Sequence, residues 1–172
     1  NLAWTEVGDP EGKPLLLIMG LGGSHRLWGN GFIDGLAQSG YRVILFDNRD
    51  VGASQRFNEE GQPVIWWNLL KNTVGLPVSA RYTLKDMAAD TVALMDELKL
   101  NDVHLVGASM GGMIAQIVAA EYPARTRSLI SIMSTTGAPH LPTPGKSDTD
   151  KIEDLAESDE DYTQKLNDSG FF

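Results

Sequence analysis

The sequence predicts an α/β fold, with a mainly parallel sheet and helices on both of its faces. Short apolar runs alternate with helical patterns along the chain, and this alternation is typical of parallel sheets. Two of the apolar runs lead directly into glycine-rich corners, at residues 20–23 and 107–112. No internal repeat or low-complexity segment interrupts the pattern.

The expected elements follow one another in a regular order. Strand-like runs lie at residues 2–7, 13–19, 41–47, 103–106 and 128–133, and helical patterns lie at residues 84–98 and 112–120. We interpret residues 2–7 as a second strand whose hairpin partner is absent from the chain. Thr83, with Asp86 three residues later, predicts a capping box for the first of these helices. Its core-facing stripe consists of Met87, Ala88, Val92, Leu94, Met95 and Leu98.

Ser109 is the candidate nucleophile. It lies between Gly107 and Gly111, after an apolar run and before a helical pattern. A serine at such a strand-to-helix corner adopts a strained backbone conformation, and glycines on either side let the strand and helix approach each other. The corner should therefore push the Ser109 hydroxyl out of the sheet toward a substrate.

An oxyanion hole is expected from two backbone amides. The Met110 N–H lies in the first turn of the helix after the serine, where amides lack partners within the helix. The second donor should be the Leu21 N–H, in the glycine-rich loop after residues 13–19. Gly20, Gly22 and Trp28 are candidates for the substrate pocket. Trp66 and Trp67 could line the same pocket, or could anchor a cap.

Several stretches of the chain resemble the α/β-hydrolase fold family, and within it the aclacinomycin methylesterase-like carboxylesterases. These stretches are residues 19–23, 46–54, 82–88, 107–111 and 131–137. Many members of the family carry glycine at the position of Asp50, and the Arg49-Asp50 pair favours the methylesterase-like branch. The resemblance implies a triad in the order Ser, Asp, His. The last two lie on later loops, so we expect the chain to be part of a longer polypeptide, with roughly 100 further residues.

The expected function is that of a serine hydrolase, which cleaves carboxylic esters through an acyl-enzyme intermediate. A thioesterase, a carbon–carbon bond hydrolase and a perhydrolase of the same fold remain open. A different class also remains, namely a non-catalytic ligand-binding member or an inactive truncated chain. The serine at the corner argues against epoxide hydrolase and haloalkane dehalogenase chemistry, for which the family has aspartate.

The three histidines are weighed as alternative general bases. His104 is interpreted as a hydrogen-bonded core residue, because it lies within the strand before the serine. His25 is expected to make a local hydrogen bond at the start of a helix. His140 lies past the end of a strand and lacks a preceding acid that would orient its ring. Asp47 and Arg49 are interpreted as structural residues that hold each other and the neighbouring loop.

A domain boundary is predicted near residue 138. Three prolines lie within residues 139–144, and prolines at this density end regular structure. From residue 145 onward there are nine acidic and three basic residues. We therefore predict the N-terminal part of a hydrolase core over residues 1–138. Residues 139–172 are predicted to form a proline-rich linker and the start of an acidic, helical cap.

Composition narrows the possible partners. The formal net charge of −9 argues against nucleic-acid binding, and no apolar run is long enough to cross a membrane. The absence of cysteine excludes a thiol nucleophile and thiolate metal ligands. We expect no metal and no cofactor, a small-molecule ester as substrate, and a cytoplasmic location. The rest of the polypeptide, or a second chain, is expected to complete the fold.

Overall fold

The computed structural model describes residues 1–56, 82–137 and 141. The chain divides into two units, Asn1–Thr136 and Gly137–Phe172. All the elements below belong to the first unit. The division predicted at residue 138 stays a prediction, as does the acidic cap, which lies outside the described residues together with Trp66, Trp67 and His140.

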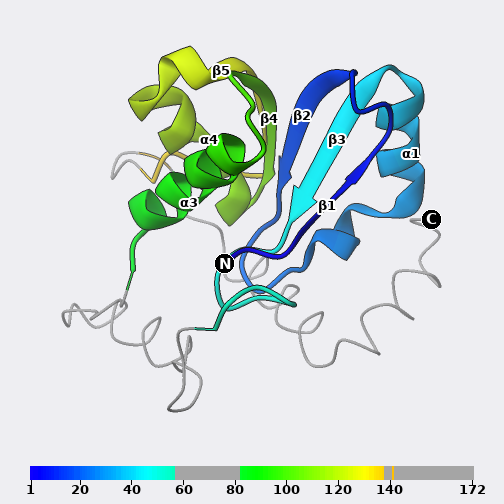
Figure 1. The fold of residues 1–172 in the computed structure, drawn as a ribbon. Helices are drawn as coiled ribbons and strands as arrows, with labels where there is room; N and C mark the ends of the chain where they lie inside the picture. The colour runs from blue at the N-terminus through cyan, green and yellow to red at the C-terminus, as the bar shows by residue number, and fades with distance from the viewer. Residues whose placement is uncertain (57–81, 138–140, 142–172) are drawn as a thin grey trace, which may run out of the picture. The chain divides into compact units, whose positions relative to one another are not determined.

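The described residues of the first unit form a five-stranded, mainly parallel sheet (Figure 1). Its strands are β1 (Trp4–Val7), β2 (Lys13–Ile18), β3 (Tyr41–Phe46), β4 (Val103–Ala108) and β5 (Thr126–Ile132). Their order is β1-β3-β2-β4-β5, and only β1 runs antiparallel to its neighbour. The predicted mainly parallel sheet is therefore confirmed, and the N-terminal strand pairs with β3 at the edge.

Helices cover both faces of this sheet. The helical elements are η1 (His25–Trp28), α1 (Asn30–Gln38), α3 (Leu84–Glu97), α4 (Met110–Glu121) and η2 (Pro123–Arg125). Leu16 and Ile18 of β2 pack in one core cluster with residues of α3 and α4, whereas Leu15 and Leu17 pack in a second cluster with Ile33 of α1. Alternate side chains of a strand point to opposite faces, so α1 lies on one face and α3 and α4 lie on the other (Figure 1). Among the described residues, no helix is long and apolar enough to cross a lipid bilayer.

The predicted capping box opens α3. The Thr83 hydroxyl accepts a hydrogen bond from the Asp86 N–H, and the Asp86 carboxylate accepts one from the Thr83 N–H at 2.6 Å. Behind this cap, the predicted apolar stripe is buried from Met87 to Met95, while Leu98 is partly buried against the same core. Hydrogen bonding and apolar periodicity thus define the same helix.

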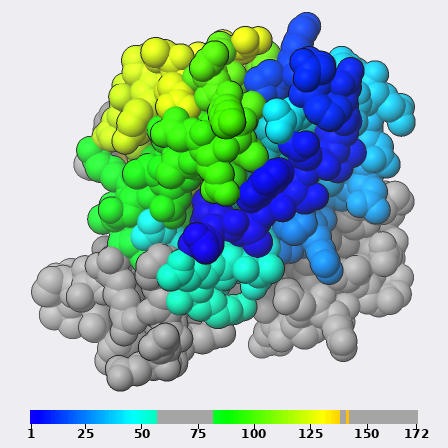
Figure 2. All heavy atoms as spheres, in the orientation of Figure 1, coloured from blue at the N-terminus to red at the C-terminus, as the bar shows by residue number. Residues whose placement is uncertain are grey.

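The N-terminus is fixed beside the loop that follows β3. The Asn1 ammonium group donates to the Gln55 side chain at 2.6 Å, and the Ala3 N–H donates to the Ser54 hydroxyl at 2.8 Å. Figure 2 shows these N-terminal residues, in dark blue, against the turquoise segment that contains residues 50–56. The edge strand and the β3 loop therefore support each other.

Candidate active site

The candidate site lies where three parallel strands end side by side. Ile18 of β2 is in register with Gly107 of β4, and Ala108 of β4 is in register with Ile132 of β5. Ser109 directly follows β4, which is the middle strand of the three. The chain leaving β2 and the chain leaving β5 consequently flank Ser109.

The backbone of Ser109 has the strained geometry expected of an exposed nucleophile. Its φ is 52° and its ψ is −121°. A residue with a Cβ is thus held in a region that glycine prefers. The Ser109 N–H donates to the Ile132 carbonyl at 2.9 Å, and the Ser109 carbonyl accepts from the Gly112 N–H at 2.9 Å. Such a conformation costs on the order of 1–3 kcal/mol and persists only because its surroundings enforce it.

Glycine is required on both sides of this corner. A Cβ on Gly111 would overlap the Ile18 carbonyl of β2, and a Cβ on Gly107 would overlap the backbone of Gly111. These overlaps involve backbone atoms, so no side-chain movement could relieve them. The close approach that the sequence predicted for Gly107 and Gly111 is therefore present.

The loop after β2 lies directly against the serine. A Cβ on Gly20 would come within 3.1 Å of the Ser109 Cβ and within 3.6 Å of its Oγ. Gly22 has a positive φ and faces open space. Among the described residues, neither the Leu21 N–H nor the Met110 N–H has a hydrogen-bond acceptor. Both amides are thus available, and their role in binding an oxyanion stays a prediction.

Two buried polar residues after β3 hold this loop in place. The Asn48 side-chain amide donates to the Met19 carbonyl at 2.9 Å. The Asp47 carboxylate accepts from the His25 N–H at 2.9 Å and from the Ala53 N–H at 3.1 Å, and lies 2.7 Å from the His25 Nδ1. Burial opposes ionisation of Asp47, but these hydrogen bonds from His25 and Ala53 outweigh it and lower the pKa of the carboxyl group. The loop is consequently anchored at both of its ends.

The sequence did not identify Asn48 as a loop anchor. One signal was available, because Asn48 follows β3 and parallel strands deliver their next residues to the same edge. The expectation for Asp47 and Arg49 was wrong in one respect, since the structure gives them different partners. The Arg49 guanidinium pairs with Asp90 at 2.7 Å and lies 4.7 Å from the centre of the Tyr82 ring. Arg49 is thereby directed to α3 and Asp47 to the loop after β2.

The backbone of Asp50 has a conformation that is unusual for a residue with a side chain. Its φ is 65°. This is a left-handed value that glycine adopts readily and that aspartate tolerates better than most residues. Burial, together with a hydrogen bond to Asp50, raises the pKa of Tyr82 to about 12. Asp50 and Arg49 therefore both contact Tyr82, at the beginning of α3.

Neither described histidine is placed as the base of a triad. His25 makes the local hydrogen bond that was predicted, to Asp47. His104 shares a hydrogen bond of 2.7 Å with the Ser128 hydroxyl, but it is half-buried, so its interpretation as a core residue was wrong. It precedes Ser109 by five residues of extended chain, which is about 16 Å. His104 is therefore too far away to take a proton from Ser109.

Trp28 lies in η1 and packs against the core cluster that contains Ile33. Its ring stacks on Phe32 with centroids 5.5 Å apart. These contacts anchor η1 to α1, and the proposed contribution of Trp28 to a substrate pocket stays a prediction. In the described part of the chain, no cluster of three or more His, Asp or Glu residues could hold a metal ion.

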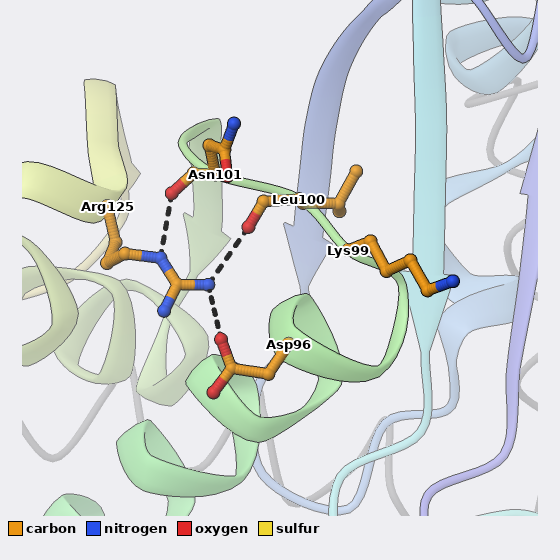
Figure 3. A pocket seen from close by; sticks show the side chains of 5 residues that line it. All are labelled: Asp96, Lys99, Leu100, Asn101 and Arg125. Carbon is orange, nitrogen blue, oxygen red and sulfur yellow. Dashed lines mark hydrogen bonds and ion pairs between the residues drawn. The ribbon is translucent and has the colours of Figure 1, made fainter.

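A separate pocket lies at the opposite edge of the sheet, where β4 begins (Figure 3). It is lined by Asp96, Lys99, Leu100, Asn101 and Arg125. The Arg125 guanidinium donates to the Leu100 and Asn101 carbonyls at 2.9 and 2.7 Å and pairs with Asp96 at 2.7 Å. The N–H groups of Arg125 thus hold η2 against the end of α3, so the residues of this pocket have a structural role.

Comparison with known proteins agrees with this geometry. The chain is 34% identical to rhodomycin D methylesterase DauP of Streptomyces sp. strain C5, over 73% of this chain and 37% of that protein. It is also 34% identical to the Mycobacterium tuberculosis protein named "Putative non-heme bromoperoxidase BpoC", over 80% of this chain and 43% of that protein. The crystal structure of a hydrolase from Pseudomonas aeruginosa PA01 matches with a TM-score of 0.63 and 23% identity, over 92% of this chain and 49% of that one.

The chain spans less than half the length of these relatives. The family described as the alpha/beta hydrolase fold matches residues 13–166. That range contains the parallel strands, the loop after β2 and the serine corner. The sequence match and the sheet order thus lead to one conclusion: the chain belongs to the alpha/beta hydrolase fold family.

Proposed function

We propose that this hydrolase cleaves carboxylic esters through an acyl-enzyme intermediate, with Ser109 as the nucleophile. The observation that carries the proposal is the left-handed conformation of an exposed serine, held between the end of β4 and the first turn of α4. A serine is not needed for packing at such a position, and the strain is offset by surrounding hydrogen bonds. Strained, exposed residues of this kind are concentrated at functional sites.

In the proposed reaction, the Ser109 Oγ attacks the ester carbonyl carbon while a general base removes its proton. The Leu21 and Met110 N–H groups donate to the oxygen that becomes negatively charged. The C–O bond to the alcohol then breaks, and the alcohol leaves with the proton. Water attacks the acyl-enzyme in the same way, which releases the carboxylic acid and restores the serine.

The general base is proposed to be a histidine oriented by an acid, both supplied by the rest of the polypeptide. His25 is occupied by Asp47, and His104 is too distant along β4. The name of DauP, rhodomycin D methylesterase, supports ester cleavage as the reaction. The same machinery would also serve a thioester or carbamate, so the choice among acyl substrates is part of the test.

The test is covalent labelling of the complete polypeptide with a fluorophosphonate probe, followed by peptide mass analysis. We expect the label on Ser109, and we expect Ser109→Ala to abolish both labelling and hydrolysis of short aryl esters. Ser24→Ala is the matched control, because Ser24 lies in the adjacent loop and its side chain does not cap η1. Labelling of another serine in the Ser109→Ala variant would contradict the proposal.

A further inference from the structure

Two exposed apolar side chains flank Ser109. Leu21 is the third residue after β2 and is 61% exposed, and Met133 directly follows β5 and is 81% exposed. Since β4 lies between β2 and β5 in the sheet, Leu21 and Met133 lie on opposite sides of the serine corner. Most other large apolar residues that the structure describes are buried, including Met87 and Met95.

The backbone holds Met133 in an unfavourable conformation. Its φ is 38°. This is a left-handed value that is uncommon for a residue with a long side chain. The preceding residue, Ile132, uses its carbonyl to accept the Ser109 N–H at 2.9 Å. The strained turn at Met133 is therefore connected to the nucleophile by a single hydrogen bond.

Exposure and strain at Met133 both oppose stability. Leaving a methionine side chain in water forgoes the free energy of burying it, and the left-handed backbone adds a further cost. Met133 directly follows β5, which ends in register with β4 beside Ser109, so a substrate held at Ser109 would lie next to this strained, exposed side chain. A flexible thioether is well suited to hydrocarbon groups of varied shape.

We infer that Met133 and Leu21 form two apolar walls that bind the hydrocarbon substituent of the ester. Met133 is thus a specificity-determining residue, which favours esters with longer alkyl chains over acetates. This inference rests on the proposed function, because it places the reacting carbonyl at Ser109. The adjacent ends of β2, β4 and β5 bring the three residues together.

The first experiment measures kcat/KM of the complete polypeptide on two ester series, one with lengthening acyl chains and one with lengthening alcohols. Met133→Gln keeps the approximate length of the side chain but makes its end polar. In one of the two series, we expect Met133→Gln to reduce the ratio of kcat/KM for the hexyl ester to kcat/KM for the shortest ester about tenfold. A loss of this size is typical when apolar contacts in a pocket are removed. Met133→Leu should retain the preference. The control is Trp4→Gln, which replaces an exposed apolar residue on β1, at the far edge of the sheet. This variant should leave the preference for longer esters unchanged.

The second experiment does not require catalysis. Exposed methionines are oxidised to sulfoxides by hydrogen peroxide faster than buried ones. Met133 should be oxidised before Met87 and Met95, as measured by peptide mass analysis. Hexanoate should slow oxidation of Met133 several-fold, whereas acetate at the same concentration should not.

The outcomes separate the two proposals. If Met133→Gln lowers kcat/KM equally for every ester, the inference is overturned. Slow oxidation of Met133 in the ligand-free protein would overturn it as well. If no ester is hydrolysed and Ser109 is not labelled, the proposed function fails. Protection of Met133 by hexanoate would then still support apolar binding at this site, and absence of protection would overturn it.

Discussion

At the scale of single residues, the site depends on backbone groups more than on side chains. Among the described residues that we propose for the chemistry, Ser109 alone contributes a side chain, and the two oxyanion donors are backbone amides. An amide cannot be removed by a conventional side-chain substitution, so its contribution is tested by removing the N–H itself. Proline does this, because its ring replaces the amide hydrogen.

Leu21 provides the clearest case. Leu21→Ala keeps the N–H and should lower kcat for an acetate ester only modestly. Leu21→Pro removes the N–H and should lower kcat on the order of 100-fold or more, as for the loss of one oxyanion donor. Circular dichroism and thermal unfolding of both variants control for misfolding. Similar, mild losses in the two variants would mean that another amide stabilises the oxyanion.

Asp47 predicts a pH-dependent stability. Its pKa in the folded protein lies below the ordinary 3.8, because hydrogen bonds to His25 and Ala53 overcome the cost of burial. A lowered pKa means that this stabilisation is complete above the ordinary value, and is lost as the pH falls through the folded-state pKa. Asp47→Asn should therefore lower the free energy of unfolding by about 1–3 kcal/mol at pH 7.

The measurement is urea unfolding of both proteins between pH 7 and pH 3. The two unfolding free energies should begin to converge as the pH falls below the ordinary 3.8, and they should converge fully below the lowered folded-state pKa of Asp47. A difference that stays constant across this range would show that the charge of Asp47 is not what stabilises the loop.

At the scale of elements, the contact between α4 and β2 decides where Ser109 sits. The helix approaches the strand so closely that a Cβ on Gly111 has no room beside the Ile18 carbonyl. Any side chain at position 111 would push the start of α4 away from the sheet. Because Ser109 is the N-cap residue of α4, such a shift would also move its hydroxyl.

Two glycine-to-alanine substitutions should have opposite effects on stability. Gly111→Ala adds a methyl group that overlaps backbone atoms, and it should destabilise the protein by about 1–3 kcal/mol or more. Gly35→Ala, in the middle of α1, meets no atom within 4 Å. It should stabilise the protein by about 0.5–1 kcal/mol. Thermal unfolding of the two variants gives the comparison, and equal effects would mean that the contact between α4 and β2 relaxes freely.

At the scale of the whole molecule, the sheet has an apolar free edge. β5 pairs only with β4 among the described strands, and its Leu129 and Ile130 are 37% and 54% exposed. An open strand of this kind is a template for pairing with another chain. The relatives are more than twice as long as the parts of them that this chain matches, so they have further chain that could cover such an edge.

A polypeptide of these 172 residues alone should therefore self-associate at micromolar concentrations, in spite of its net charge of −9. Light scattering after size-exclusion chromatography measures the mass as a function of concentration. Ile130→Lys adds a charge to the edge strand and should shift the chain toward monomer. A monomer at every concentration without this substitution would show that the edge is protected.

The sequence by itself predicted the five strands, the helices α3 and α4, and the candidate serine corner. The capping box of Thr83 and Asp86, the stripe along α3 and the spacing of the glycines around Ser109 can all be recognised from residues that are close together in the chain. Such patterns report helical and strand periods directly. They therefore predicted the mainly parallel sheet and both candidate amide donors without reference to the rest of the fold.

Tertiary structure decided which distant residues meet. Asp47 lies close to Arg49 in the chain, yet it bonds to His25, while Arg49 reaches Asp90 of α3. Met133 became part of the candidate site only because the order β2-β4-β5 puts the end of β5 beside Ser109. Strand order depends on how all the apolar faces pack together, and no local period encodes that choice. The sequence thus identified the candidate nucleophile, whereas the order of the strands in the folded sheet determined which residues lie beside it.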